Sequence, residues 1–175
     1  MIGVEEATRR IRDTVRILPR HVVSLAEAHG RVLREAVVAA RDVPPFDRVM
    51  MDGIALWHGA WRDGRRAFAL RGEIAAGHAP IELPDPEKDC LAVMTGAVLP
   101  PGCDCVIPVE EISVRDGTAE MVEGIEVRAG QFIHRQGSDR PRGDTLLRPG
   151  VVLEPARNGF AATEGCADLR GTRPP

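Results

Sequence analysis

The chain has 175 residues, 43% of them hydrophobic, which suits one large or two small globular domains and excludes a disordered chain. Its net charge of −3, with no stripe of lysine and arginine, gives no reason to expect nucleic acid as a partner. The N-terminus lacks the order of a signal peptide, and no apolar run approaches the ~20 residues that cross a bilayer. We therefore expect a cytoplasmic protein that does not associate with a membrane.

Residues 4–18 form the first segment with a regular pattern. Apolar residues recur there at near-helical spacing, with charged residues between them, and Pro19 follows. This pattern predicts an amphipathic helix that ends at the proline. Its apolar face is expected to contact the core or a dimer partner; the residues are Val4, Ile11, Val15 and Leu18.

The next segment, Ser24-Leu25-Ala26-Glu27, matches a capping box, in which a hydroxyl and a carboxylate satisfy backbone amides at a helix start. It predicts a short helix that Gly30 ends in the left-handed conformation. The β-branched centre of residues 31–40 favours an extended segment.

Between residues 54 and 133, short apolar runs alternate with clusters of Gly, Pro and Asp, which indicates a compact β domain. Asp116-Gly117 predicts a hairpin turn because this dipeptide accepts positive φ. The expected strands include residues 68–70, 91–94, 106–109, 112–114 and 125–127.

The pattern changes again after Gly143. Residues 145–153 favour an extended conformation, and Pro155 and Gly165 can open and close a short helix. Residues 170–175 have the composition of a linker, so we expect a further domain to follow.

Three turns rich in Gly or Pro each carry a small polar or acidic side chain, at residues 43–53, 94–102 and 130–139. Paired prolines exclude a helix before Asp52-Gly53, and glycine has no Cβ barrier to unusual dihedral angles. Thr95 follows an apolar strand and is expected at its end. Asp52 and Asp139 could bind a hydrated divalent ion or orient a water molecule. The alternative is that Asp52 only forms a turn and Thr95 only ends its strand.

The pair Cys103 and Cys105 invites a metal interpretation. A zinc site needs about four ligands in recognisable pairs. Neither Cys90 nor Cys166 supplies a matching motif, so we interpret all four cysteines as structural.

Together, the three turns resemble the N-terminal region of the MoeA family, the molybdopterin molybdenumtransferases that include the E domain of gephyrin. The resemblance extends from Ser24 to Gly165. Its most specific part is the middle motif, from Thr95-Gly96-Ala97 to Pro108-Val109-Glu110, followed by Pro44-Pro45-Phe46-Asp47 with Met51-Asp52-Gly53. Gly137, Asp139 and Gly143-Asp144 form a weaker third match.

The resemblance implies a mixed α/β composition that is mainly β. Residues 1–43 and 142–175 would form a discontinuous, elongated dimerisation domain of helix and strands. Residues 44–141 would form an inserted compact β domain. The family's C-terminal pterin-binding domain would begin beyond Pro175, and it could act in cis or in trans.

The resemblance also implies an activity. Family members use Mg²⁺ and molybdate to convert adenylylated molybdopterin into molybdenum cofactor, with release of AMP. Asp52, Thr95 and Asp139 match positions in the family's catalytic cleft, and Asp52 is the candidate Mg²⁺ ligand. The candidate substrate-binding residues are Asp47, Glu110 and Arg135.

Three positions depart from the family pattern: Val49 stands for the usual Ser, Ile54 for Tyr and His134 for Arg. Two hypotheses remain. The chain is the N-terminal part of a transferase, which we expect to be inactive alone, or it is a dimerisation or binding module without catalysis.

Overall fold

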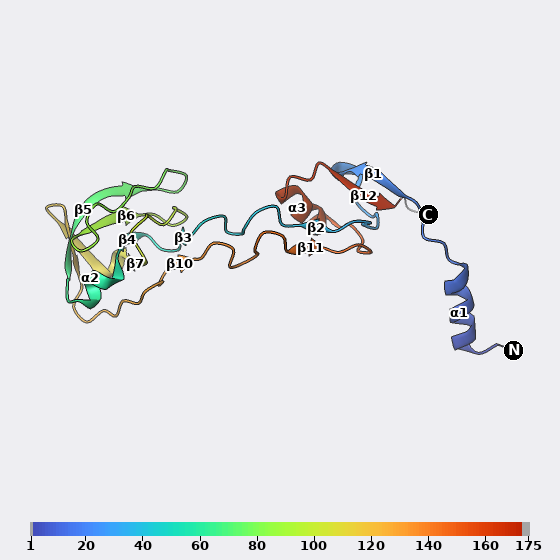
Figure 1. Cartoon of the computed structure of the whole chain (residues 1–175), viewed down its shortest axis with the longest axis horizontal. Coiled ribbons are helices and arrows are strands. Elements are labelled where there is room, and N and C mark those ends of the chain that lie inside the picture. Colours follow the sequence, from blue (N-terminus) through green and yellow to red (C-terminus); the bar gives the residue numbers. More distant parts are fainter. Residues whose placement is uncertain (1, 173–175) are drawn as a thin grey trace. The chain divides into compact units, whose positions relative to one another are not determined.

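The computed structural model describes residues 2–172, and the chain divides into two compact units. Unit 1 comprises Met1–Ala40 with Gly143–Pro175, and unit 2 comprises Arg41–Arg142. Unit 2 is therefore inserted in the sequence of unit 1 (Figure 1). Strands are more numerous than helices, which confirms the expected mainly β composition.

Unit 2 is built on a six-stranded sheet with the order β7-β4-β6-β5-β9-β8. Strands β5 and β6 pair in parallel, and the other neighbours pair antiparallel. The strands are β4 (Gly53–Leu56), β5 (Ala67–Ile74), β6 (Asp89–Val93), β7 (Cys105–Pro108), β8 (Ile112–Arg115) and β9 (Thr118–Met121). A short pair, β3 (Arg48–Val49) and β10 (Ile133–His134), helix α2 (His58–Arg62) and the 3₁₀ turn η2 (Val109–Glu111) complete the unit.

Both faces of the sheet are buried at β4, β6 and β7, each in its own apolar cluster. Ile54 and Leu56 of β4 belong to one cluster, whereas Ala55 between them belongs to the other. Successive side chains of a strand point to opposite faces, so the two clusters require continuous apolar runs. This explains why β4 and β7, and most of β6, show no polar alternation, whereas β9 has both buried and exposed positions.

The Asp116-Gly117 hairpin is confirmed, with φ of 48° and 72° at the two residues, as a type I′ turn requires. The strand expected at residues 125–127 is wrong, because the structure has no regular element there. Val127 is nevertheless buried, so the apolar run marks core packing rather than pairing.

Unit 1 contains two short antiparallel pairs and a helix around a single apolar cluster. Leu33 and Leu153 at its centre are fully buried. The elements are β1 (Arg20–Ser24) with β12 (Asp168–Thr172), β2 (Val37–Val38) with β11 (Thr145–Leu147), the 3₁₀ turn η1 (Leu25–Glu27), α1 (Val4–Thr14) and α3 (Pro155–Thr163). Helix α3 opens at Pro155, and Gly165 follows with a φ of 77°, as predicted.

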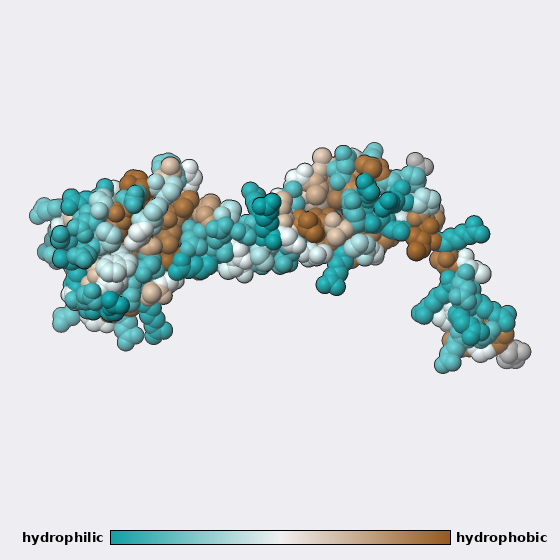
Figure 2. Space-filling view, viewed as in Figure 1, coloured by the Kyte–Doolittle hydropathy of each residue, from teal (hydrophilic) through white to brown (hydrophobic). Residues whose placement is uncertain are grey.

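Helix α1 ends at Thr14, four residues earlier than predicted. The Thr14 hydroxyl donates to the carbonyls of Arg10 and Ile11, and Val15 is already extended. β-Branched residues such as Val15 favour an extended backbone. No residue of α1 is buried, so no tertiary packing opposes this preference by stabilising a further helical turn. Figure 2 shows hydrophobic surface where the chain leaves this helix.

Two other expectations for unit 1 are corrected. Ser24 makes no capping hydrogen bond, since it is the last residue of β1, and the next residues form only a 3₁₀ turn. The backbone amide of Leu25 donates instead to the carbonyl of Ala167. Residues 170–172 are not a linker but part of β12, because their backbone forms the ladder with β1 and this pairing does not depend on side-chain composition. Residues 173–175, the rest of the expected linker, lie outside the described residues. No helix among the described residues is long and apolar enough to span a bilayer.

Candidate functional site

The three polar turns of the sequence meet along strand β3. On one side, β3 pairs with β10, so that Val49 lies opposite Ile133 and Arg48 opposite His134. On the other side, Val49 donates to the carbonyl of Ala97 at 2.9 Å and accepts from the amide of Gly96 at 2.9 Å. Segments more than 40 residues apart in sequence thus become neighbours through main-chain hydrogen bonds.

Asp52 and Thr95 are joined directly. One carboxylate oxygen, Oδ1 of Asp52, accepts from both the backbone amide and the hydroxyl of Thr95, each at 2.7 Å. Both residues are exposed. Oδ2 of Asp52 accepts no hydrogen bond from the described residues, so this oxygen is available to a ligand.

The hydrogen bonds to Thr95 hold the pKa of Asp52 below its usual range, the backbone amide contributing most. Such bonds favour the charged form of a carboxylate. Asp52 is therefore an anion at neutral pH, suited to bind a cation and not to donate a proton.

Gly53 explains the placement of Asp52, although for a different reason than expected. Its φ is not among the positive values in the chain; Gly53 begins β4, between β6 and β7. A Cβ there would lie 1.9 Å from the carbonyl oxygen of Ile107. The glycine allows close strand approach, which fixes the start of β4 and the residue before it.

His134 links Arg48 to Asp139. Nη2 of Arg48 lies 2.9 Å from Nδ1 of His134, and Nε2 of His134 lies 2.8 Å from Oδ1 of Asp139. Guanidinium groups only donate, so Nδ1 accepts from Arg48 and the proton of the neutral ring is on Nε2, where it is donated to Asp139. This assignment fixes the orientation of the imidazole.

A shallow depression of ≈ 360 Å³ lies between these two sets of residues. Thr95 lines it together with Arg48 and His134. The hydroxyl of Thr95, bonded to Asp52, and the imidazole, bonded to Asp139, therefore border the same hollow. Of the three residues Asp52, Thr95 and Asp139, only Thr95 lines the depression; Asp52 and Asp139 are connected to it by their hydrogen bonds to Thr95 and His134.

Asp47 and Arg135 pair with each other. Nη1 of Arg135 lies 2.5 Å from Oδ2 of Asp47, and the amide of Gln136 donates to Oδ1 at 2.8 Å. The bond from Gln136, followed by the interaction with Arg135, lowers the pKa of Asp47. This contact ties the first turn to the third.

Glu110 is exposed on η2 and has no side-chain hydrogen bond within the described residues. The amide of the preceding residue, Val109, donates to the carbonyl of Asp52 at 2.9 Å, so η2 lies beside the candidate site. Of the departures from the family pattern, Val49 and Ile54 are each 1% exposed and pack in the two apolar clusters of unit 2. Val49 also lines the depression, whereas Ile54 does not line it.

Sequence reasoning missed Arg48, Asp42 and Phe132. Asp42 accepts from the side chain of Gln136 and from the amide of Arg142, which lowers its pKa, the Arg142 bond contributing most. Phe132 has a φ of 53°, and its carbonyl accepts from Met50. Such a conformation is uncommon for a bulky residue and marks a constrained segment. Arg48 and Phe132 lie inside two of the three turns identified from the sequence, and Asp42 directly precedes the first, but no local pattern distinguished these residues from their neighbours.

The described residues contain no group of three or more His, Cys, Asp or Glu side chains that could hold a metal ion. Mg²⁺ often takes only one or two protein carboxylates, with water and substrate phosphate completing an octahedron. The free oxygen of Asp52 fits one such position, and the remaining ligands would come from outside this chain.

All four cysteines are free thiols, and Cys90, Cys103 and Cys105 are buried. Burial raises the pKa of Cys90 and of Cys103 to about 12. A protonated, buried thiol is unreactive, which supports the structural interpretation of these residues.

A family model described as "MoeA N-terminal region (domain I and II)" matches residues 2–165. The chain is 45% identical over 132 residues to a molybdopterin molybdenumtransferase of Synechocystis, covering 75% of this chain and 34% of the relative. It is 36% identical over 151 residues to that of Synechococcus elongatus, covering 84% and 37%. The chain thus spans little more than a third of these relatives.

Solved structures agree. A molybdopterin biosynthesis MoeA protein from Pyrococcus horikoshii superposes with a TM-score of 0.80 at 28% identity, over 92% of this chain and 43% of that chain. A second crystal structure gives a TM-score of 0.83 at 22% identity, over 99% and 45%, and supports the fold alone. By sequence and by fold, this chain belongs to the MoeA N-terminal region family.

Proposed function

We propose that this chain supplies one wall of the active site of a molybdopterin molybdenumtransferase, with molybdate and adenylylated molybdopterin as substrates. The observation that carries the proposal is the double hydrogen bond from Thr95 to Oδ1 of Asp52. It holds an anionic carboxylate at a strand start and leaves Oδ2 free.

In this proposal, Oδ2 of Asp52 supplies one ligand to Mg²⁺, which would offset the charge of the substrate phosphates. Thr95 orients the carboxylate and its oxygen accepts a hydrogen bond from substrate. Arg48 keeps four further N–H donors after bonding His134 and lines a hollow large enough for a phosphate group, to which we propose it donates.

Asp139 acts through His134 in this arrangement. By accepting a hydrogen bond from Nε2–H, Asp139 keeps Nδ1 as the acceptor for Arg48, and so holds the guanidinium beside the depression. Asp139 is thus a positioning residue in our proposal. Asp47 and Arg135 order the surrounding turns through their ion pair, and Glu110, exposed on η2, is proposed to contact substrate.

A chimaera tests the proposal. This chain would replace the matching N-terminal region of the Synechocystis enzyme, and AMP release from adenylylated molybdopterin would be measured with molybdate and Mg²⁺. We expect turnover that falls by about 10²-fold in Asp52→Ala, the scale of losing a key electrostatic group. Thr95→Val is expected to lose less, because the backbone amide bond remains.

Glu123→Ala is the matched control, since Glu123 is an exposed carboxylate of unit 2 with no hydrogen bond among the described residues. It should keep full turnover. A folded chimaera in which Asp52→Ala is as active as the control would contradict the role of the carboxylate. A folded but inactive parent chimaera would favour the binding-module hypothesis.

We further propose that the chain forms a homodimer. The apolar side chains of α1 and the following segment are uncovered: Val4 is 83% exposed, Ile11 63% and Val15 67%. Light scattering should give twice the chain mass of 19.0 kDa at micromolar concentration. Ile11→Asp should shift that mass to one chain, and a single-chain mass for the unmodified protein would refute the dimer.

A further inference from the structure

Unit 2 carries two further hollows that share lining residues. Trp57, just before α2, lines a cavity of ≈ 520 Å³ and a neighbouring one of ≈ 550 Å³, and Glu87 lines both as well. Neither shares a lining residue with the depression at Thr95. Volumes in this range accommodate small organic ligands.

The indole of Trp57 is held in place by its neighbours. It packs across Gly59, where a Cβ would lie 2.3 Å from ring atom Cζ2. Trp57 also contacts the buried cluster that contains Ile54. The other tryptophan, Trp61, is already stacked on His58 at 5.7 Å. Of the two tryptophans, only Trp57 lines these two cavities.

Two charged side chains that line the first cavity form no hydrogen bond or ion pair with the other described residues. Arg65 lines the first cavity, and neither it nor Glu87 has a side-chain hydrogen bond or ion pair there. The nearest competitors are engaged: Lys88 bonds Asp85 at 3.0 Å, and Asp85 also accepts from the backbone amide of Glu87 at 3.0 Å.

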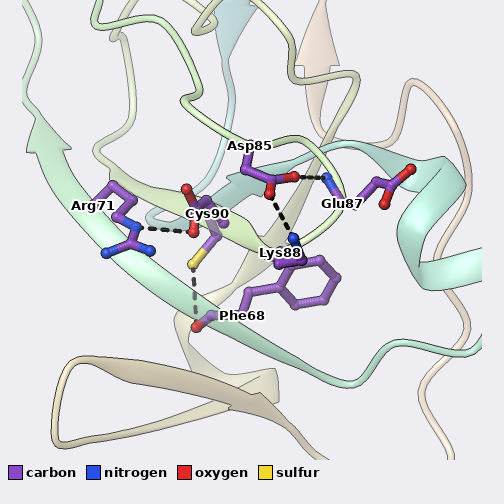
Figure 3. A network of polar contacts seen from close by, with 7 residues as sticks. Phe68, Arg71, Asp85, Glu87, Lys88 and Cys90 are labelled. Atoms are coloured by element: carbon purple, nitrogen blue, oxygen red, sulfur yellow. Dashed lines mark hydrogen bonds and ion pairs between the residues drawn. The ribbon is translucent and has the colours of Figure 1, made fainter.

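Figure 3 shows this arrangement: the carboxylate of Glu87 extends away from the Asp85 and Lys88 pair, to which it is connected only by its backbone nitrogen. Glu87 is thus an acceptor without a neutralising cation in the described structure. Arg66 is less available than Arg65, because its guanidinium lies 4.6 Å from the Trp61 ring centre and donates to two carbonyls.

Trp57, Arg65 and Glu87 together narrow the class of ligand. Asp63 also lines the first cavity, but it is paired with Arg62 at 3.1 Å. An indole face favours a planar ring. Arg65 only donates and Glu87 only accepts, so a hydrocarbon would leave both unsatisfied. A simple anion would be repelled by Glu87, and a simple cation by Arg65. A ring edge with adjacent N–H donors and a carbonyl or ring-nitrogen acceptor satisfies both, and guanine carries these groups.

We propose that Trp57, Glu87 and Arg65 form a binding site for a purine base of the guanine type. Trp57 stacks on the ring, Glu87 accepts from its N–H groups, and Arg65 donates to its acceptor edge. The inference stands on this cavity alone and does not rest on the proposed transferase activity.

Intrinsic fluorescence provides the test, because the chain has two tryptophans and no tyrosine. In the Trp61→Phe variant of the full 175-residue chain, Trp57 is the only indole. We expect guanosine to quench it saturably, with half-saturation below about 1 mM, a modest small-ligand affinity. Uridine, which has a smaller ring, and adenosine, which lacks the oxo group, should bind at least about tenfold more weakly.

Variants then assign the groups. Guanosine affinity, measured by equilibrium dialysis, should fall by about 5- to 150-fold in Trp57→Leu, which is the fold-change expected for one base stacked on an aromatic ring. Glu87→Gln and Arg65→Gln should each weaken binding by at least about fivefold, whereas Glu123→Gln should not. Both positions are exposed, so these variants are expected to fold, and circular dichroism checks this.

Three results would overturn the proposal: no saturable quenching by guanosine, equal binding of uridine, or the same quenching by inorganic phosphate alone. Unchanged binding in both Glu87→Gln and Arg65→Gln would also overturn it. None of these results bears on AMP release by the chimaera, so the two proposals fail separately.

Discussion

Replacing Gly53 with alanine should destabilise unit 2 severely. The added Cβ would lie 1.9 Å from the carbonyl oxygen of Ile107 and 3.0 Å from the carbonyl carbon of Pro108. Both atoms belong to the backbone of β7, so no side chain can rotate away. Strand β4 is held on its other side by β6, so relief requires β4 and β7 to separate.

The cost has two parts. Overpacking a buried site typically costs about 1–3 kcal/mol, and each ladder hydrogen bond lost at the start of β4 adds about 1 kcal/mol. We therefore expect Gly53→Ala to lower the free energy of unfolding of unit 2 by about 2–4 kcal/mol. Asp52 would move with the strand, and the bonds from Thr95 would be lost with it.

Urea unfolding followed by tryptophan fluorescence measures the free energy of unfolding of unit 2, because Trp57 and Trp61 both lie in that unit. With a typical slope of about 1–2 kcal/mol per M, the midpoint should fall by at least about 1 M. Gly159→Ala is the matched control: Gly159 lies inside α3, where a Cβ meets nothing within 4 Å. It should leave this midpoint unchanged and stabilise α3 by about 1 kcal/mol. An unchanged midpoint in Gly53→Ala would refute the close-approach explanation.

Three further predictions concern titratable groups. The pKa of Asp47 is lower in the folded chain than in the unfolded chain, where it is near 3.8. Its contribution to stability is therefore complete above pH 3.8 and is lost as the pH falls through the folded-state pKa. Between about pH 5 and 3, the urea midpoint of unfolding should fall less in Asp47→Asn than in the parent chain. Thr95→Val should raise the pKa of Asp52 towards its usual value, as measured by NMR titration of the carboxyl carbon, and an unchanged pKa would show that the hydroxyl bond contributes nothing. Cys166, the half-buried thiol, should react first with a disulfide reagent, and fast modification of all four cysteines in the folded chain would contradict their burial.

Local features of the fold were predictable where a short segment decides its own conformation. The Asp116-Gly117 turn is an example, because positive φ is required at both positions and few residues accept it. The Ser24 to Glu27 segment shows the limit: its sequence satisfies a capping box, but the backbone of Leu25 bonds Ala167 instead. A contact more than 100 residues away in sequence overrode a local preference.

For the candidate site, too, the local sequence predicted some features and long-range contacts decided the others. The sequence alone determined which residue types are candidates for the site, because carboxylate, hydroxyl and glycine-rich turns are local patterns, and it identified the family through them. Tertiary structure alone decided that Thr95 bonds Asp52, that His134 stands between Arg48 and Asp139, and that Val49 is buried. These outcomes depend on strand register, since a shift of one residue exchanges the two faces of a strand, and register is set by pairing between segments that no local pattern connects.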